Sequence, residues 1–123
     1  MLSLRIIDSI TELQPADAGC IALSGSHGGL SSARYAIAAR PLLSVFNDAG
    51  VGLDGAGIAG LALMQASGLA ACAVSHMSAR IGQAASTFEQ GVVSHANEAA
   101  RALGIEAGRP LRPQIEDLSR RHT

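Results

Sequence analysis

The chain has 123 residues, 48% of them hydrophobic but only 2% aromatic, and a formal net charge of −1. This length is typical of one domain, and the apolar content favours a packed core over a disordered chain. The balanced charge and the scarcity of aromatic side chains argue against nucleic-acid binding.

Short apolar segments alternate with helical segments along the first two thirds of the chain. The alternation of Leu2, Leu4 and Ile6 with polar residues predicts a half-buried first strand. Further short apolar runs predict strands at 20–23, 42–46 and 69–74, and the segments between them predict helices at 30–40 and about 56–67. Asp54 is placed to cap the second of these helices.

The last third of the sequence predicts one long helix and a tail. Ser86 and Glu89 have the spacing of a capping box. An apolar stripe then repeats at helical intervals from Phe88 to Leu103, and Gly104 ends the helix. The remaining residues, 108–123, read as a C-terminal tail with room for one short helix.

This order of elements predicts a single α/β domain over residues 1–123. We expect a small three-layer sandwich around a short, mainly parallel sheet of about four strands, with a Rossmann-like or flavodoxin-like topology. Such a sheet gathers its strand-to-helix loops at one edge, where ligands of open α/β sheets bind. Because small side chains bury little area each, we also expect the domain to self-associate as a homo-oligomer.

The loop expected at residues 24–29 contains Gly25, Gly28 and Gly29 just before a helix. Glycines in that position can expose backbone N–H groups that bind a phosphate or a carboxylate. The loop has neither the Lys of a P-loop nor a GxGxxG pattern, so it does not predict nucleotide binding.

The same loop has the pattern of a nucleophile turn, with Ser26 at its centre. The segment 24–28 resembles the nucleophile turn of α/β-hydrolases, with Ser24 where that family usually has Gly. The resemblance implies Ser26 as the nucleophile, followed in the chain by Asp48 as the acid and His76 as the base.

The loops after the next two predicted strands are also polar. Asn47 and Asp48 could bind substrate or orient a His, or they could simply stabilise a turn. Ser78 and Arg80 are candidates for substrate binding, because an Arg can hold a carboxylate or phosphate through two hydrogen bonds. The alternative for this Arg is an exposed ion pair with Asp48, Asp54 or Glu89.

Two histidines at strand ends, His27 and His76, are the candidate general acid/base residues. Together with Asp48 they could also form a metal site, although no short-range metal motif supports one and we predict no metal. His95, on the predicted long helix, is expected to be a packing residue.

We therefore expect an enzyme that acts on a small anionic metabolite, with no cofactor indicated. The alternatives are a non-catalytic ligand-binding or regulatory module, a structural subunit of a homo-oligomer, and a serine hydrolase. Residues 58–74 are apolar but interrupted and too short to cross a membrane. Cys20 and Cys72 lie in apolar runs and are expected to be free thiols, as in a cytoplasmic protein.

Overall fold

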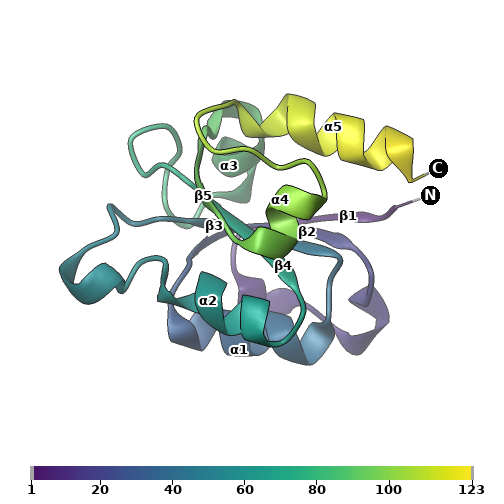
Figure 1. Ribbon diagram of the computed structural model, residues 1–123, viewed down its shortest axis with the longest axis horizontal. Helices are drawn as coiled ribbons and strands as arrows, with labels where there is room; N and C mark the ends of the chain where they lie inside the picture. The colour runs from purple at the N-terminus through teal and green to yellow at the C-terminus, as the bar shows by residue number, and fades with distance from the viewer. Residues whose placement is uncertain (1, 123) are drawn as a thin grey trace.

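Alternating strands and helices build a five-stranded sheet between two helical layers (Figure 1). The computed structural model describes residues 2–122. The strands are β1 (Leu4–Ile7), β2 (Ile21–His27), β3 (Leu43–Asn47), β4 (Ala70–Val74) and β5 (Val93–Ala96). They lie in sequence order, β1 to β4 are parallel, and β5 runs antiparallel to β4. The predicted α/β sandwich with a mainly parallel sheet is confirmed.

Helices cover both faces of this sheet. α1 (Leu30–Ala39) and α2 (Ala59–Ala66) lie on one face, and α3 (Ala84–Gln90) and α5 (Leu111–Arg121) lie on the other (Figure 1). The short α4 (Glu98–Ala102) contacts β4. Each face has its own core, one around Phe46 and Met64 and the other around Leu23 and Ile115. Short 3-10 turns occupy Ile10–Glu12, Pro15–Asp17 and Leu53–Gly55.

The long helix expected after Ser86 does not form. α3 ends at Gln90 with Gly91 as its C-cap, and the next residues lead into β5, so His95 lies on a strand opposite Ala73. The β-branched pair Val92-Val93 favours extended backbone, and pairing with the edge of β4 outweighs a weak helical stripe. Ser86 consequently lies within α3 instead of capping it.

The C-terminal segment is part of the core and not a tail. α5 has 11 residues, and its Leu111, Ile115 and Leu118 are fully buried. Arg112 of this helix lies over the ring of Phe88 at 5.0 Å and pairs with Glu89, which ties α5 to α3. Pro113, with Pro110 just before the helix, suggested an irregular segment with room for only one short helix.

Two boundaries near the strand ends also differ from expectation. β2 continues through Ser26 to His27, so these residues belong to a strand and not to a loop. α2 begins at Ala59, and Asp54 lies in a 3-10 turn at φ 55° without capping the helix.

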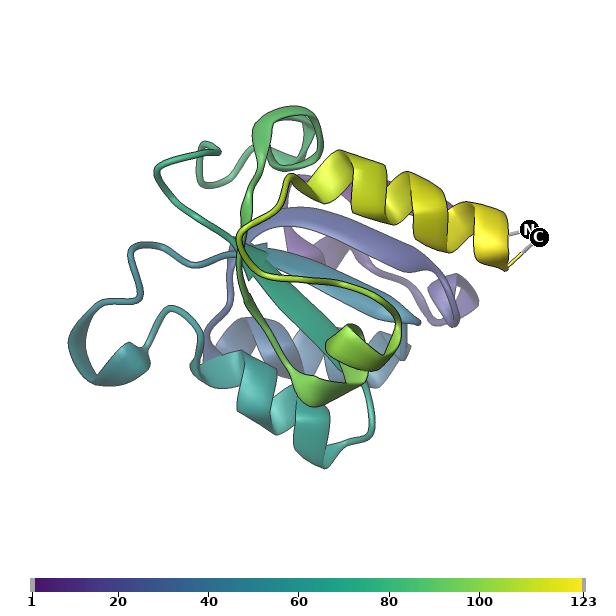
Figure 2. The same cartoon turned by 45° about the horizontal axis from the view of Figure 1, so that its top comes forward.

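The connections after β3 and β4 leave the sheet in opposite directions. The β3 connection leads to α2 below the sheet, and the β4 connection leads to α3 above it (Figures 1 and 2). Diverging connections of this kind open a crevice at the carboxyl ends of the strands. Within residues 2–122, no helix has the length and apolar character needed to span a bilayer.

Candidate functional site

A cleft of about 580 Å³ lies at this edge of the sheet. Its walls are residues 76–81 of the loop after β4, Ala49 of the loop after β3, and Ser86 and Gln90 of α3. The volume falls within the range of small-molecule sites, roughly 300 to 1,000 Å³. Of the predicted site residues, His76, Ser78 and Arg80 line this cleft.

Asp48 contacts both the backbone and the ring of His76 and fixes the position of this residue. Its Oδ1 accepts a hydrogen bond from the backbone N–H of His76 at 3.0 Å and lies 3.4 Å from the Nδ1 of the same residue. The backbone N–H of Gly50 donates to the same oxygen at 2.8 Å. The Asp48 side chain is 7% exposed, whereas that of His76 is 48% exposed. A buried carboxylate therefore orients a histidine that is open to the cleft.

Asp48 keeps its negative charge although it is buried. Burial raises the pKa of its carboxyl, but hydrogen bonds from Gly50, Ser94 and His76 and the charge of His76 outweigh that effect. The net result is a pKa below the ordinary value of 3.8. At neutral pH, Asp48 is therefore an anion that faces the ring of His76.

Arg80 also lines the cleft, and its charge is uncompensated within residues 2–122. Its backbone N–H donates to Ser86 Oγ at 2.9 Å, but its guanidinium makes no ion pair within residues 2–122. None of the acidic partners considered for it pairs with it within residues 2–122: Asp48 contacts His76, Glu89 pairs with Arg112, and Asp54 makes no ion pair. This guanidinium is free to bind an anion from solution.

Asn47 and Ser78 hold the loops of the site in place. Asn47 is fully buried, donates to the carbonyl of Ala79 at 3.1 Å and accepts from the N–H of Ala49 at 2.8 Å. Ser78 Oγ donates to the carbonyl of Ser75 at 2.7 Å and accepts from the N–H of Val92 at 2.9 Å. Asn47 thus links the two loops that flank the cleft, and only Ser78 reaches its wall.

His27 lies at the end of β2 and is not part of the cleft wall. Its Nδ1 accepts a hydrogen bond from the backbone N–H of Gly29 at 3.2 Å. β3 separates β2 from β4, and strands two apart lie about 10 Å from each other. His27 and His76 are therefore placed on different parts of the edge.

Ser26 does not occupy a nucleophile turn. It lies within β2, and its Oγ accepts a hydrogen bond from the backbone N–H of Ile10 at 2.9 Å, on the side toward β1. Neither His27 nor His76 hydrogen-bonds to this hydroxyl. The arrangement that the α/β-hydrolase resemblance implies is absent from residues 2–122.

The expected backbone anion cradle is also not formed, because its N–H groups already have partners. Gly25 donates to the carbonyl of Asp8, Gly28 to that of Asn47, and Gly29 to His27. A Cβ on Gly25 would lie 2.3 Å from the backbone nitrogen of Gln83, so this glycine permits close packing of β2 against the start of α3.

Metal ligation has no geometric support in the described chain. Within residues 2–122, no group of three or more His, Cys, Asp or Glu side chains is arranged to hold a metal ion. His27, His76 and Asp48 do not converge in this way.

Three residues near the site were not expected from the sequence. Ser86 and Gln90 line the cleft from α3, with Ser86 Oγ donating to Gln90 Oε1 at 2.8 Å. Ser94, on β5, contributes to the low pKa of Asp48. No sequence signal marked them as site residues, since Ser86 was expected to cap the predicted long helix and Gln90 and Ser94 lay within it.

Comparisons with protein-family models, with curated proteins and with solved structures found no match to the chain.

Proposed function

We propose that the cleft binds a small anionic metabolite and that His76 exchanges a proton with it. One observation carries this proposal: a buried Asp48 orients a half-exposed His76 on the same wall as the unpaired guanidinium of Arg80. Convergence of an oriented titratable group and an uncompensated charge in one cleft is typical of an active site.

The proton-transfer step depends on the contact between Asp48 and His76. With Nδ1 directed at the carboxylate, Nε2 of the neutral ring carries the lone pair and can accept a proton. The imidazolium that results is stabilised by the anionic Asp48. The Nδ1–Oδ1 distance of 3.4 Å is long for a hydrogen bond, as is common for catalytic contacts before substrate binds.

Arg80 would hold the anionic group of the substrate, either a phosphate or a carboxylate. A guanidinium binds both groups through two parallel hydrogen bonds. Ala49, Met77 and Ile81 line the same cleft and offer apolar surface to the carbon skeleton. General acid/base chemistry fits better than covalent catalysis, because the hydroxyls of Ser78 and Ser86 are both engaged.

A non-catalytic binding module is the second candidate. The observation in its favour is that, within residues 2–122, the cleft wall carries one histidine, His76, and no acidic side chain that could act as a second acid or base. For either role we also propose a cytoplasmic location, supported by the two buried cysteines that remain free thiols.

A thermal-shift screen against inorganic phosphate, sugar phosphates and carboxylic acids tests the binding step. A ligand at 100 times its dissociation constant stabilises the fold by about 2.7 kcal/mol, which raises Tm by roughly 10 °C for a domain of this size. The shift should disappear in Arg80→Gln and persist in the control Arg34→Gln, an exposed residue of α1. A shift that Arg80→Gln leaves intact would place the ligand elsewhere.

Each ligand that binds is then incubated with the protein and followed by NMR for conversion or for exchange of carbon-bound hydrogen with solvent. We expect His76→Gln to retain binding and lose turnover by at least about 100-fold, the usual contribution of a general acid/base residue. Binding without turnover in the wild type would favour the non-catalytic module.

A further inference from the structure

The loop between β3 and α2, residues 48–58, projects from the body of the molecule (Figures 1 and 2). At its tip, Leu53 is 85% exposed, and the neighbouring Asp54 is exposed and makes no ion pair within residues 2–122. A large apolar side chain and a negative charge thus lie together at the end of a projecting loop, where a partner chain can contact both.

The loop presents this tip in a defined conformation. The N–H of Val51 donates to the carbonyl of Asp48 at 2.7 Å, and the N–H of Gly57 donates to the carbonyl of Val51, also at 2.7 Å. Val51 has a φ of 67° and Asp54 a φ of 55°, which are unfavourable for residues with a side chain. Backbone bonds at the base of the loop thus hold a conformation that the free chain would avoid.

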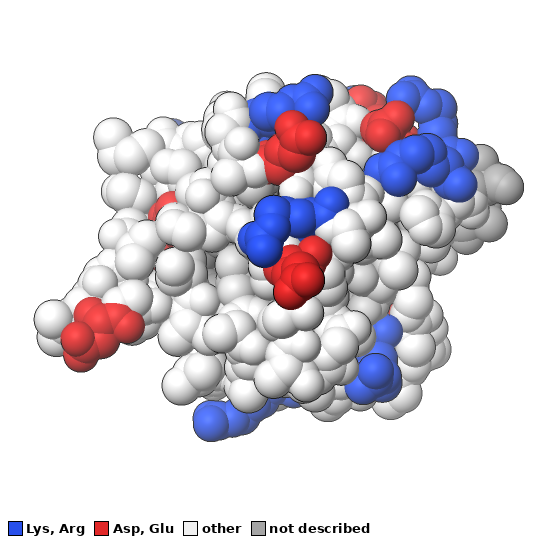
Figure 3. All heavy atoms as spheres, in the orientation of Figure 1, with Lys and Arg blue, Asp and Glu red and all other residues white. Residues whose placement is uncertain are grey.

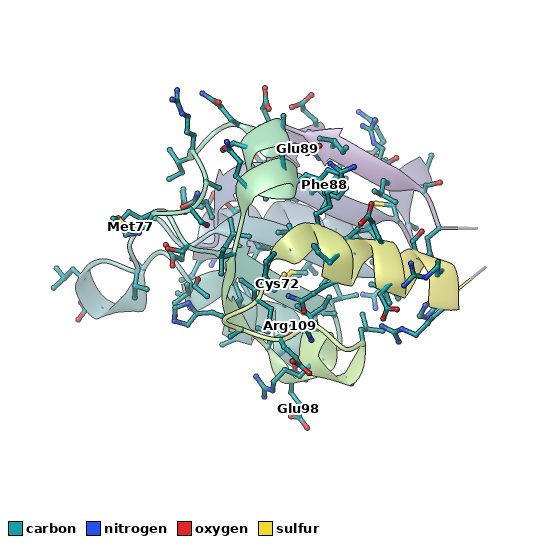
Figure 4. All side chains as sticks on the ribbon, turned by 90° about the horizontal axis from the view of Figure 1, so that it is seen from above. Cys72, Met77, Phe88, Glu89, Glu98 and Arg109 are labelled. Carbon is teal, nitrogen blue, oxygen red and sulfur yellow. The ribbon has the colours of Figure 1, made fainter. Side chains whose placement is uncertain are left out.

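The cleft has the complementary surface. Met77 is 83% exposed and Ile81 53% exposed, and they flank the unpaired Arg80. Figure 4 shows Met77 at the outer edge of its loop, away from the helices. Two exposed apolar side chains and a positive charge in one cleft complement the apolar and negative tip of the projecting loop.

We propose that two copies of this chain associate by inserting the tip of each projecting loop into the cleft of the other. Leu53 would pack against Met77 and Ile81 of the second copy, and Asp54 would pair with its Arg80. Each cleft then contains a carboxylate from the other copy. Such a reciprocal contact closes at two subunits. The inference shares Arg80 with the proposed function but is independent of proton transfer by His76.

Light scattering and sedimentation equilibrium at micromolar concentration test this contact. We expect a mass of twice the 12.5 kDa chain. Leu53→Ser should shift the protein toward monomer, whereas Tyr35→Ser, which alters another exposed large side chain, on α1, should leave the dimer intact. A monomeric wild type, or a dimer that withstands Leu53→Ser, would overturn the proposal.

Exchanging the charges of Asp54 and Arg80 tests the proposed ion pair. Asp54→Arg and Arg80→Asp should each raise the dimer dissociation constant roughly tenfold or more, because each places like charges together twice in the dimer. The double variant restores opposite charges and should recover most of the lost affinity. Failure to recover, with circular dichroism showing folded protein, would refute the Asp54–Arg80 pair.

The dimer experiments and the experiments on the proposed function can fail independently of each other. His76→Gln should leave the dimer unchanged, and a monomeric wild type would leave the ligand-induced thermal shift intact. If both inferences hold, inorganic phosphate in excess should compete with Asp54 for Arg80 and weaken the dimer.

Discussion

Two buried serines on adjacent strands form a matched pair for testing hydrogen-bond energetics. Ser24 and Ser44 are both fully buried. The hydroxyl of Ser24 donates to the carbonyl of Val45 at 2.7 Å, whereas that of Ser44 has no hydrogen-bond partner within residues 2–122. In register, Ser44 lies between Ala22 and Ala71, so apolar side chains surround it.

Substitution by Ala should therefore have opposite effects at the two positions. Ser24→Ala removes a buried hydrogen bond and should lower the free energy of unfolding by about 1 kcal/mol. Ser44→Ala removes a hydroxyl that was desolvated without compensation and should raise the free energy of unfolding by up to about 1 kcal/mol. The two variants should differ by up to about 2 kcal/mol.

Urea denaturation followed by circular dichroism measures this difference. With m values of about 1–3 kcal/mol/M, the midpoints of the two variants should lie up to roughly 1 M apart. Unchanged m values would show that the denatured state is not affected. If Ser44→Ala destabilised the protein as much as Ser24→Ala, the hydroxyl of Ser44 would have a partner and the reasoning would be refuted.

Four further outcomes follow from burial, packing and charge. Asp48→Asn should be least stable relative to wild type above pH 4, and the difference in the free energy of unfolding should shrink as the pH falls. The lowered pKa of Asp48 stabilises the fold above its ordinary pKa of 3.8, and that stabilisation is lost as the carboxyl protonates. Denaturation curves that show the same difference at every pH between 2 and 7 would contradict this. Cys72 is fully buried and its pKa is raised to about 12, so a thiol reagent should label it only as fast as the protein unfolds, and rapid labelling of the native state would count against its burial. Ile115→Ala should cost about 2–5 kcal/mol in urea denaturation, since its side chain is fully buried, and a cost near zero would mean that α5 is not part of the core. Gly25→Ala should destabilise the protein more than Gly82→Ala in the same assay. A Cβ at Gly25 would lie 2.3 Å from backbone, whereas a Cβ at Gly82, at φ 79°, would meet open space. The reverse order would refute the close packing of β2.

The central strands were predictable because their apolar runs are short and interrupted by polar, Gly-rich segments. The runs at 42–46 and 69–74 match β3 and β4 within one residue at each end. The prediction of one helix from Phe88 to Leu103 was wrong for a physical reason. The apolar spacing of this segment fits a helix, but Val92 and Val93 pair with the open edge of the sheet. Such pairing depends on residues about twenty positions away, which local periodicity does not contain.

The edge that holds the cleft was predictable, but the lining of the cleft was not. Polar residues after each parallel strand indicated the edge at which the cleft lies, and this edge carries the contact between Asp48 and His76. The sequence could not show that the N–H groups of Gly28 and Gly29 were already bonded, nor that Ser26 faces Ile10. Hydrogen bonding between segments decides which polar groups remain available, and no local pattern reports it.

The order of the strands bears on how the protein folds as it is synthesised. Each strand pairs with the one made just before it, so the sheet can grow without waiting for distant sequence. The core under α1 and α2 is complete once residue 73 has joined it, whereas the opposite core needs Leu118. In Figure 4, Cys72 lies beneath α5, on the face that this last helix covers. A ribosome-bound chain would thus have one finished face and one open apolar face until its final helix emerged, which makes that interval the one most exposed to aggregation.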